Sequence, residues 1–85
     1  MMTPEEQMLI GAVRYALGRM TYIVGVTCDF IEANRKKLSR ECMSIILIDV
    51  MEEIEMYHRL GKTCGMEIDE SRWRRLVEVL EEELE

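Results

Sequence analysis

The sequence predicts an all-α fold, a compact bundle of three or four helices. Apolar residues recur at spacings of three and four along most of the chain, a capping motif opens the first such stretch, and Gly18 and Gly61 follow the first and third stretches. With 85 residues the chain is expected to form one domain, residues 1–85. The expected helices span about residues 4–17, 21–34, 40–60 and 70–84.

The first expected helix begins with the strongest local signal in the sequence. Thr3 is a good N-cap, Pro4 suits the first helical position, and Glu6 can complete a capping box. Because Gly18 favours a helix C-terminus, we expect this helix to end near Gly18. Its apolar stripe consists of Met8, Leu9, Ala12, Val13, Ala16 and Leu17.

The segment 21–27 is rich in β-branched residues, which favour a strand by propensity. We predict a helix, because the apolar positions keep helical spacing and no second strand is expected to pair with the segment. If this helix continued from the first, Gly11, Gly18 and Gly25 would line one face and allow a close neighbour. The apolar positions are Ile23, Val24, Thr27, Phe30 and Ile31.

The third expected helix carries unusually wide apolar surface. Ser39 is its expected N-cap and Gly61 its stop. Such a helix should lie at the centre of its bundle or be shared with a second chain. Its main face holds Met43, Ile46, Leu47, Val50, Ile54 and Tyr57, and Ile45, Ile48 and Met51 widen it.

The last expected helix follows a connecting loop, residues 62–68, and Asp69 is its expected N-cap. Its apolar residues keep helical spacing and are expected to point inward. They are Trp73, Leu76, Val77, Leu80 and Leu84.

Charge and cysteine content limit the function. The formal net charge of −6 disfavours direct binding of nucleic acid, since phosphates repel an acidic protein. Cys28, Cys42 and Cys64 have no close spacing, which argues against a disulfide framework and favours a reducing cytoplasm. Cys28 and Cys42 lie among apolar residues and are expected to be buried and inert. No apolar run approaches the roughly 18 residues of a membrane span.

No motif indicates catalysis, so we expect a protein that is not an enzyme and needs no cofactor. Glu55 and His58 form a Glu-x-x-His pair, but a di-iron bundle needs two such motifs, which only a symmetric dimer could supply. The preferred interpretation is that His58 lies in a last helical turn, where the dipole favours a cation. The cysteines and His58 also lack the ligand spacing of a structural zinc site.

Acidic residues concentrate on the third helix and at the C-terminus, in segments 49–55 and 78–85. They form either a solvated surface or a surface that imitates nucleic acid and occupies a basic groove on another protein. For the second interpretation, the expected contacts are Glu52, Glu53, Glu55, Glu81 and Glu82. A second candidate set, whose alternative role is packing of the first turn between helices, is Arg14, Tyr15, Arg19 and Tyr22.

Basic residues cluster at 35–40 and 72–75, a pattern also seen in DNA-binding helix-turn-helix proteins. The helix that follows the first cluster is almost wholly apolar and therefore unsuited to reading base edges. The alternative is that these basic segments meet acidic segments of neighbouring helices.

The stretch from Val13 to Tyr22, Val-Arg-Tyr-Ala-Leu-Gly-Arg-Met-Thr-Tyr, resembles small helical proteins encoded by bacteriophages and prophages of Gram-positive bacteria. Cys28-Asp29, Ile48-Asp49 and the segment 69–73 extend the resemblance over most of the chain. The resemblance implies a phage setting in the host cytoplasm and no particular activity. By analogy, short acidic phage proteins act by stoichiometric binding, and inhibitors of CRISPR nucleases are one such class.

Three functional hypotheses follow. The first is a phage or prophage protein that binds and inhibits a host protein, such as a nucleic-acid-processing defence enzyme. The second is a structural homo-oligomer, with a homodimer formed through the third helix. The third is a small DNA-binding regulator, which would bind in a salt-dependent manner.

Overall fold

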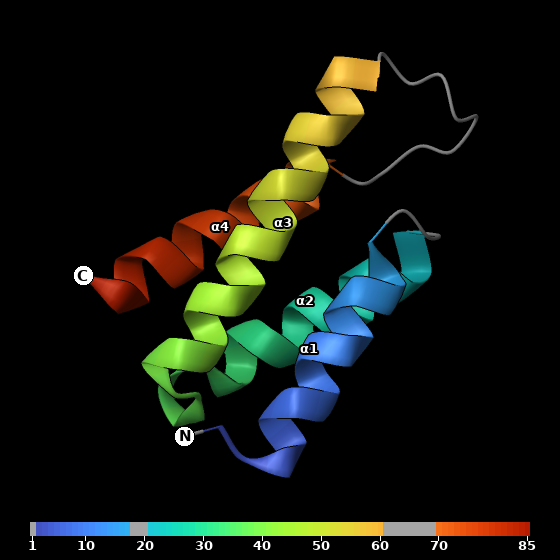
Figure 1. Cartoon of the computed structure of the whole chain (residues 1–85). Coiled ribbons are helices and arrows are strands. Elements are labelled where there is room, and N and C mark those ends of the chain that lie inside the picture. The colour runs from blue at the N-terminus through green and yellow to red at the C-terminus, as the bar shows by residue number, and fades with distance from the viewer. Residues whose placement is uncertain (1, 18–20, 61–69) are drawn as a thin grey trace.

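Four α-helices and one 3₁₀ turn make up the described part of the chain in a computed structural model (Figure 1). The structure describes residues 2–17, 21–60 and 70–85, apart from the side chains of residues 21–23, 57 and 60. The predicted all-α fold is confirmed, and every helix boundary lies within one residue of its predicted position. The elements are α1 (Pro4–Ala16), α2 (Thr21–Asn34), the 3₁₀ turn η1 (Arg35–Lys37), α3 (Arg40–Leu60) and α4 (Glu70–Leu84).

The helices are arranged as a ring around one core. α1 packs against α2 and α3, and α4 packs against the same two helices. Four seams therefore join neighbouring helices, in the order α1–α2, α2–α4, α4–α3 and α3–α1. The face formed by α1 and α2 lies opposite the face formed by α3 and α4 (Figure 1).

Local signals at the start of α1 form as predicted. The Oγ1 atom of Thr3 accepts a hydrogen bond from the Glu6 amide at 3.2 Å, and the Glu6 Oε1 atom accepts one from the Thr3 amide at 3.1 Å. This capping box satisfies two amides that the first helical turn leaves without partners. At the other end, Leu17 has extended backbone angles (φ −60°, ψ 126°), so α1 ends just before Gly18, which lies outside the described residues.

The later helix boundaries are confirmed where the structure describes them. Ser39 caps α3, because its Oγ atom accepts a hydrogen bond from the Cys42 amide at 3.1 Å. The β-branched segment 21–27 is helical, as predicted. Val24 is fully buried in the core, and packing of this kind outweighs the strand propensity of the segment. The predicted stop Gly61, the loop 62–68 and the predicted cap Asp69 lie outside the described residues.

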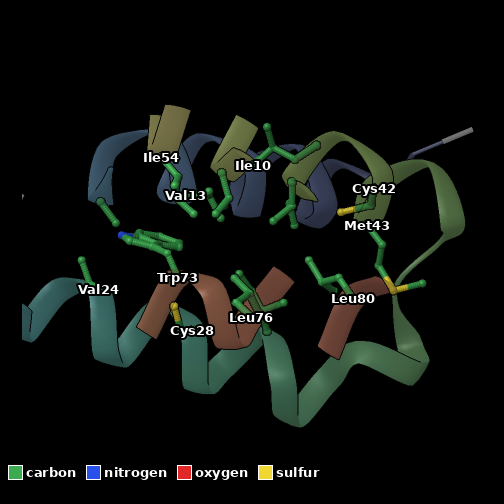
Figure 2. Packing of buried hydrophobic residues seen from close by; sticks show 14 residues of the cluster. Ile10, Val13, Val24, Cys28, Cys42, Met43, Ile54, Trp73, Leu76 and Leu80 are labelled. Carbon is green, nitrogen blue, oxygen red and sulfur yellow. The ribbon is translucent and has the colours of Figure 1, made fainter. Parts of the chain in front are cut away.

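One hydrophobic cluster joins all four helices (Figure 2). Trp73 lies toward one end of it, between Val24 and Cys28 on one side and Val13 and Ile54 on the other (Figure 2). The inward face predicted for the last helix is confirmed, with Val77 and Leu84 packed at the edge of the cluster. The buried members are Ile10, Val13, Ala16, Val24, Cys28, Ile31, Cys42, Met43, Ile46, Val50, Ile54, Trp73, Leu76 and Leu80.

Three predicted inward positions on the first two helices are wrong. Met8 is 76% exposed, Ala12 is exposed, and Phe30 is 55% exposed. In α1 the cause is Glu6, whose Oε2 atom accepts a hydrogen bond from the Ser39 amide at 2.7 Å. This bond holds the side of α1 that carries Glu6 and Ile10 against the bundle. Met8, two residues after Glu6, lies on the opposite side of the helix and is therefore exposed.

α3 packs against both α1 and α4, so it is one of four helices in the ring and does not occupy the central position that the sequence predicts as one alternative. Its apolar surface is wider than the bundle covers, because Ile48 is 55% and Met51 is 49% exposed. Among the described helices, none has both the length and the apolar character required to cross a membrane.

Candidate functional site

The face formed by α3 and α4 contains a groove that combines apolar and acidic side chains. Its hollow encloses about 530 Å³ between the two helices. Met51 and Ile54 from α3 and Val77 from α4 form an apolar floor. The carboxylates along the rim are Glu55, Glu78 and Glu81, and together with the floor they define the acidic groove.

His58 and Arg74 also line the groove, at the end near the start of α4. The Nε2 atom of His58 lies 2.6 Å from Glu70 Oε1, and Arg74 Nε donates to Glu70 Oε2 at 2.7 Å. The hydrogen bond from Arg74, supported by the His58 contact, lowers the pKa of Glu70. The negative charge of Glu70 is therefore balanced locally by its two partners. The excess negative charge of the groove comes from the carboxylates along its rim.

Glu55 on the rim also has a local partner. Arg59 donates to Glu55 Oε1 at 2.6 Å, one turn along α3. Both side chains are more than two-thirds exposed, so water screens this pair and it contributes little to stability. A basic group from a bound partner can therefore replace Arg59 at small cost.

The structure divides the five glutamates predicted as partner contacts. Only Glu55 and Glu81 line the acidic groove together. Glu52 lies next to Glu55 on the outer surface of α3. Glu53 lines the α3–α1 seam and Glu82 the α2–α4 seam, so neither belongs to this groove.

Glu78, Met51 and Val77 belong to the groove but were not among the predicted partner contacts. A signal for Glu78 does exist, because Glu78 and Glu81 are three residues apart and therefore share one side of a helix. The sequence gives no comparable signal for Met51, because its spacing shows only that it belongs to the wide apolar face of α3. The groove that it lines is formed by α3 and α4 together.

The second predicted set has a partly structural role. Arg14 Nε donates to Asp49 Oδ2 at 2.8 Å, which ties α1 to α3 and raises the pKa of Arg14. This contact differs from the packing alternative for Arg14, which placed it at the turn between the first two helices. Tyr15 is 59% exposed on the outer side of α1. Arg19 and the side chain of Tyr22 lie outside the described residues.

Ion pairs between basic and acidic segments form across the α2–α4 seam, as the internal alternative predicts. Arg72 contacts Asp29 at 2.5 Å and also contacts Glu32, and Arg75 lies 3.3 Å from the same Glu32. Near η1, Arg35 lies 3.6 Å from Glu83. Much of the basic charge in these segments is therefore balanced within the chain.

The Glu-x-x-His motif does not form a ligand pair in this structure, since Glu55 contacts Arg59 and His58 contacts Glu70. Within the described residues, no group of three or more His, Cys, Asp and Glu side chains is placed to hold a metal ion. Cys28 and Cys42 are fully buried, as predicted, and Cys64 lies outside the described residues.

The surroundings of Cys42 make its thiol unreactive. Burial, assisted by the nearby carboxylates of Glu6 and Glu41, raises the pKa of Cys42 to about 11. At neutral pH the thiol is therefore protonated and a poor nucleophile.

Comparison with known proteins finds no matching family model, and no curated protein or solved structure with significant similarity. The function of the chain is therefore inferred from its own geometry.

Proposed function

We propose that this protein binds a basic, amphipathic segment of another protein in the acidic groove and inhibits that protein by covering the segment, without catalysis. The observation that carries the proposal is the composition of the groove. Apolar side chains form its floor, and the carboxylates of Glu55, Glu78 and Glu81 form its rim. A helix with Lys or Arg beside an apolar stripe has the complementary composition.

Each part of the groove has a distinct role in this proposal. The half-exposed Met51 provides a deformable apolar contact, since a thioether side chain adapts to irregular partners. The rim carboxylates select basic partners and orient them. The net charge of −6 accelerates the encounter with a basic protein at moderate ionic strength.

Proteins that act on nucleic acids carry basic segments of this kind, and covering such a segment blocks the nucleic acid. In the phage setting implied by the resemblance, we propose that the partner is a host defence enzyme, such as a CRISPR nuclease. Charge complementarity supports the basic segment, and the resemblance supports the choice of host enzyme.

Binding to the groove is tested with a fluorescent amphipathic peptide helix that has Lys on one face and Leu on the other. We expect micromolar binding by fluorescence anisotropy, and weaker binding as salt rises because screening reduces surface attraction. The double charge reversal Glu55→Lys with Glu81→Lys should weaken binding roughly tenfold or more.

The matched control is the double variant Glu53→Lys with Glu82→Lys. It changes the same helices and the same net charge, but its positions line other seams. We expect this control to retain most of the affinity. Equal losses in both double variants would mean that the peptide responds to overall charge, and the groove would not be the binding site.

Inhibition is tested separately, by phage challenge of a Gram-positive host with an active CRISPR system that expresses the chain. The proposal predicts that interference falls with the native chain and with the Glu53, Glu82 control, and recovers with the Glu55, Glu81 variant. If interference is unaffected by the native chain, the proposed host nuclease is wrong, even where peptide binding holds.

A further inference from the structure

The face formed by α1 and α2 exposes several large apolar side chains, and the charged residues Glu5 and Lys37 lie only beside the hollow near η1. Met8 is 76% and Tyr15 59% exposed on α1, and Val26 and Phe30 are each 55% exposed on α2. With the exposed Ala12, these residues define the uncharged face. In a chain where 33% of residues are charged, such a patch is typical of an interaction surface.

Apart from Glu5, which lines the hollow on this face, most charged side chains of α1 and α2 pair with other helices. Arg14 pairs with Asp49 on α3, and Asp29 and Glu32 of α2 pair with Arg72 on α4. Between the described residues, no ion pair joins α1 to α2. Ion pairs join Arg14 to Asp49 and Arg72 to Asp29 across two of the other seams, and His58 Nε2 lies 2.6 Å from Glu70 Oε1 across the α3–α4 seam.

The uncharged face also contains a hollow that suits a protruding side chain. About 470 Å³ is enclosed between α1, α2 and η1, and its apolar lining comes from Leu9, Phe30 and Leu38. Glu5 and Lys37 lie at its polar edge. The same surface therefore offers both an exposed aromatic ring and an apolar hollow beside it.

We propose that the uncharged face binds a second copy of this chain and forms a dimer with two-fold symmetry. A two-fold interface brings the same patch of both copies together, so the patch must be complementary to itself. An uncharged apolar face with a ring and a hollow meets this condition. Faces rich in glutamate do not, because like charges would oppose one another.

The charge of the chain favours this face over the others. Each copy has a net charge of −6, so two copies repel unless their acidic residues stay apart. The bundle measures 37 × 23 × 20 Å, so pairing through the uncharged face places the acidic groove of each copy roughly 20 Å from the interface. That distance is about twice the Debye length of about 8 Å at physiological ionic strength, and the repulsion is largely screened.

The area of the face is consistent with a modest dimer. Helices of 13 and 14 residues are each about 20 Å long, and two adjacent helices cover a width of about 20 Å. The face therefore offers about 400 Å² per partner, or about 800 Å² in total, which is below the roughly 1,000 Å² of a stable interface and corresponds to a weak, transient dimer. We therefore expect a dissociation constant in the micromolar range. Both acidic grooves face outward in such a dimer, and the proposal does not depend on what they bind.

Sedimentation velocity of the full chain across the micromolar range tests the dimer. The expected mass rises from 10.0 kDa toward twice that value with concentration. Phe30→Glu should remain monomeric, and Val26→Glu provides a second test at an equally exposed site. Ile48→Glu is the matched control, because Ile48 is 55% exposed on α3, outside the uncharged face. Circular dichroism establishes that each variant is folded.

Salt provides an independent readout. Added salt should strengthen the dimer, because it screens the repulsion between two acidic chains without weakening apolar contacts. A monomeric native chain at millimolar concentration overturns the proposal. Dissociation by Ile48→Glu but not by Phe30→Glu also overturns it, and places the dimer on α3. Co-sedimentation of a monomeric chain with neutral lipid vesicles overturns it in favour of a lipid surface.

Discussion

The α1–α2 face and the α3–α4 face belong to the same core but differ in charge. The first exposes Met8, Tyr15 and Phe30 and has no ion pair across its seam between described residues. The second has a polar contact across its seam and glutamates along its groove. The difference indicates that a thin bundle can keep two surfaces of different composition, because each seam between helices has its own side chains.

α2 shows how the separation arises. One side of the helix carries Asp29 and Glu32, which contact Arg72 of α4. The other side carries Val26 and Phe30 and faces the seam with α1 or the solvent. A period of 3.6 residues allows one helix to present an acidic side and an uncharged side on either flank of its buried stripe.

The largest effect is expected from a substitution in the core that both faces share. Trp73→Ala should cost about 3–5 kcal/mol of unfolding free energy, because Trp73 is the largest fully buried side chain of the core. A chain of this size has a total stability of about 4–13 kcal/mol, so the variant should lose a large fraction of it and melt well below the native chain. Thermal and urea melts followed by circular dichroism measure the loss.

The control for this prediction is Tyr15→Ala, at a site that is 59% exposed. It should change stability by less than about 0.5 kcal/mol. If Trp73→Ala instead leaves one helix pair folded, with a second melting step, the two faces are separate folding units and the comparison fails.

The next largest effect is expected when the ion pairs on the charged side of α2 are removed. The Arg72 side chain is 18% exposed and Glu32 is 16% exposed. Burial alone would lower the pKa of Arg72, but hydrogen bonds to Glu32 and Asp29 raise it overall. Arg72→Ala should cost about 2–3 kcal/mol, because it leaves a half-buried carboxylate with fewer partners.

The matched comparison for Arg72 is Arg74→Ala, two residues along the same helix. Arg74 is 55% exposed and pairs with Glu70 within its own helix. Its loss should be several times smaller in urea denaturation, since exposed pairs contribute little. Equal losses of stability in Arg72→Ala and Arg74→Ala would mean that burial of the Arg72 ion pairs does not increase their contribution to stability.

Acid should weaken the link between α1 and α3. Hydrogen bonds from the Ser39 and Thr3 amides lower the pKa of Glu6 below its ordinary value of 4.5. A carboxylate with a lowered pKa stabilises the fold fully above its unfolded pKa, and this contribution is lost as pH falls through the folded value. The melting temperature should therefore fall below about pH 4.5 more steeply in the native chain than in Glu6→Gln.

At neutral pH, Glu6→Gln should melt several degrees below the native chain, because the amide cannot accept both backbone hydrogen bonds as strongly as the carboxylate. Glu5→Gln is the control, since Glu5 lies next to Glu6 and is exposed. Identical acid profiles for the native chain and Glu6→Gln would contradict a special role for this carboxylate.

The helix boundaries could be predicted because their causes are local. The capping box at Thr3 and the cap at Ser39 depend on neighbouring residues alone. The rotation of each helix could not be predicted, because the hydrogen bond that turns α1 joins Glu6 to Ser39, 33 residues away. The same limit applies to the site, since periodicity places Glu55 and Glu81 on helices without indicating that α3 and α4 bring them together.

The smallest expected effect concerns helix propensity, which also separates the two sides of the bundle. α1 and α2 each contain an interior glycine, Gly11 and Gly25, whereas α3 and α4 contain none. A Cβ atom at either glycine would meet nothing within 4 Å. Gly11→Ala and Gly25→Ala should each raise the unfolding free energy by about 0.5–1 kcal/mol, because alanine loses less backbone entropy in a helix.

Urea denaturation of the monomer at low concentration measures these gains, and the two should add, because the substitutions lie on different helices. A loss of stability would mean that a backbone approaches one of these glycines closely. Because no described atom of the chain comes that close, the approaching backbone would have to belong to a second copy or to residues 18–20 or 61–69. Repeating the measurement at concentrations above and below dimer formation separates these two sources, since only a second copy makes the loss depend on concentration.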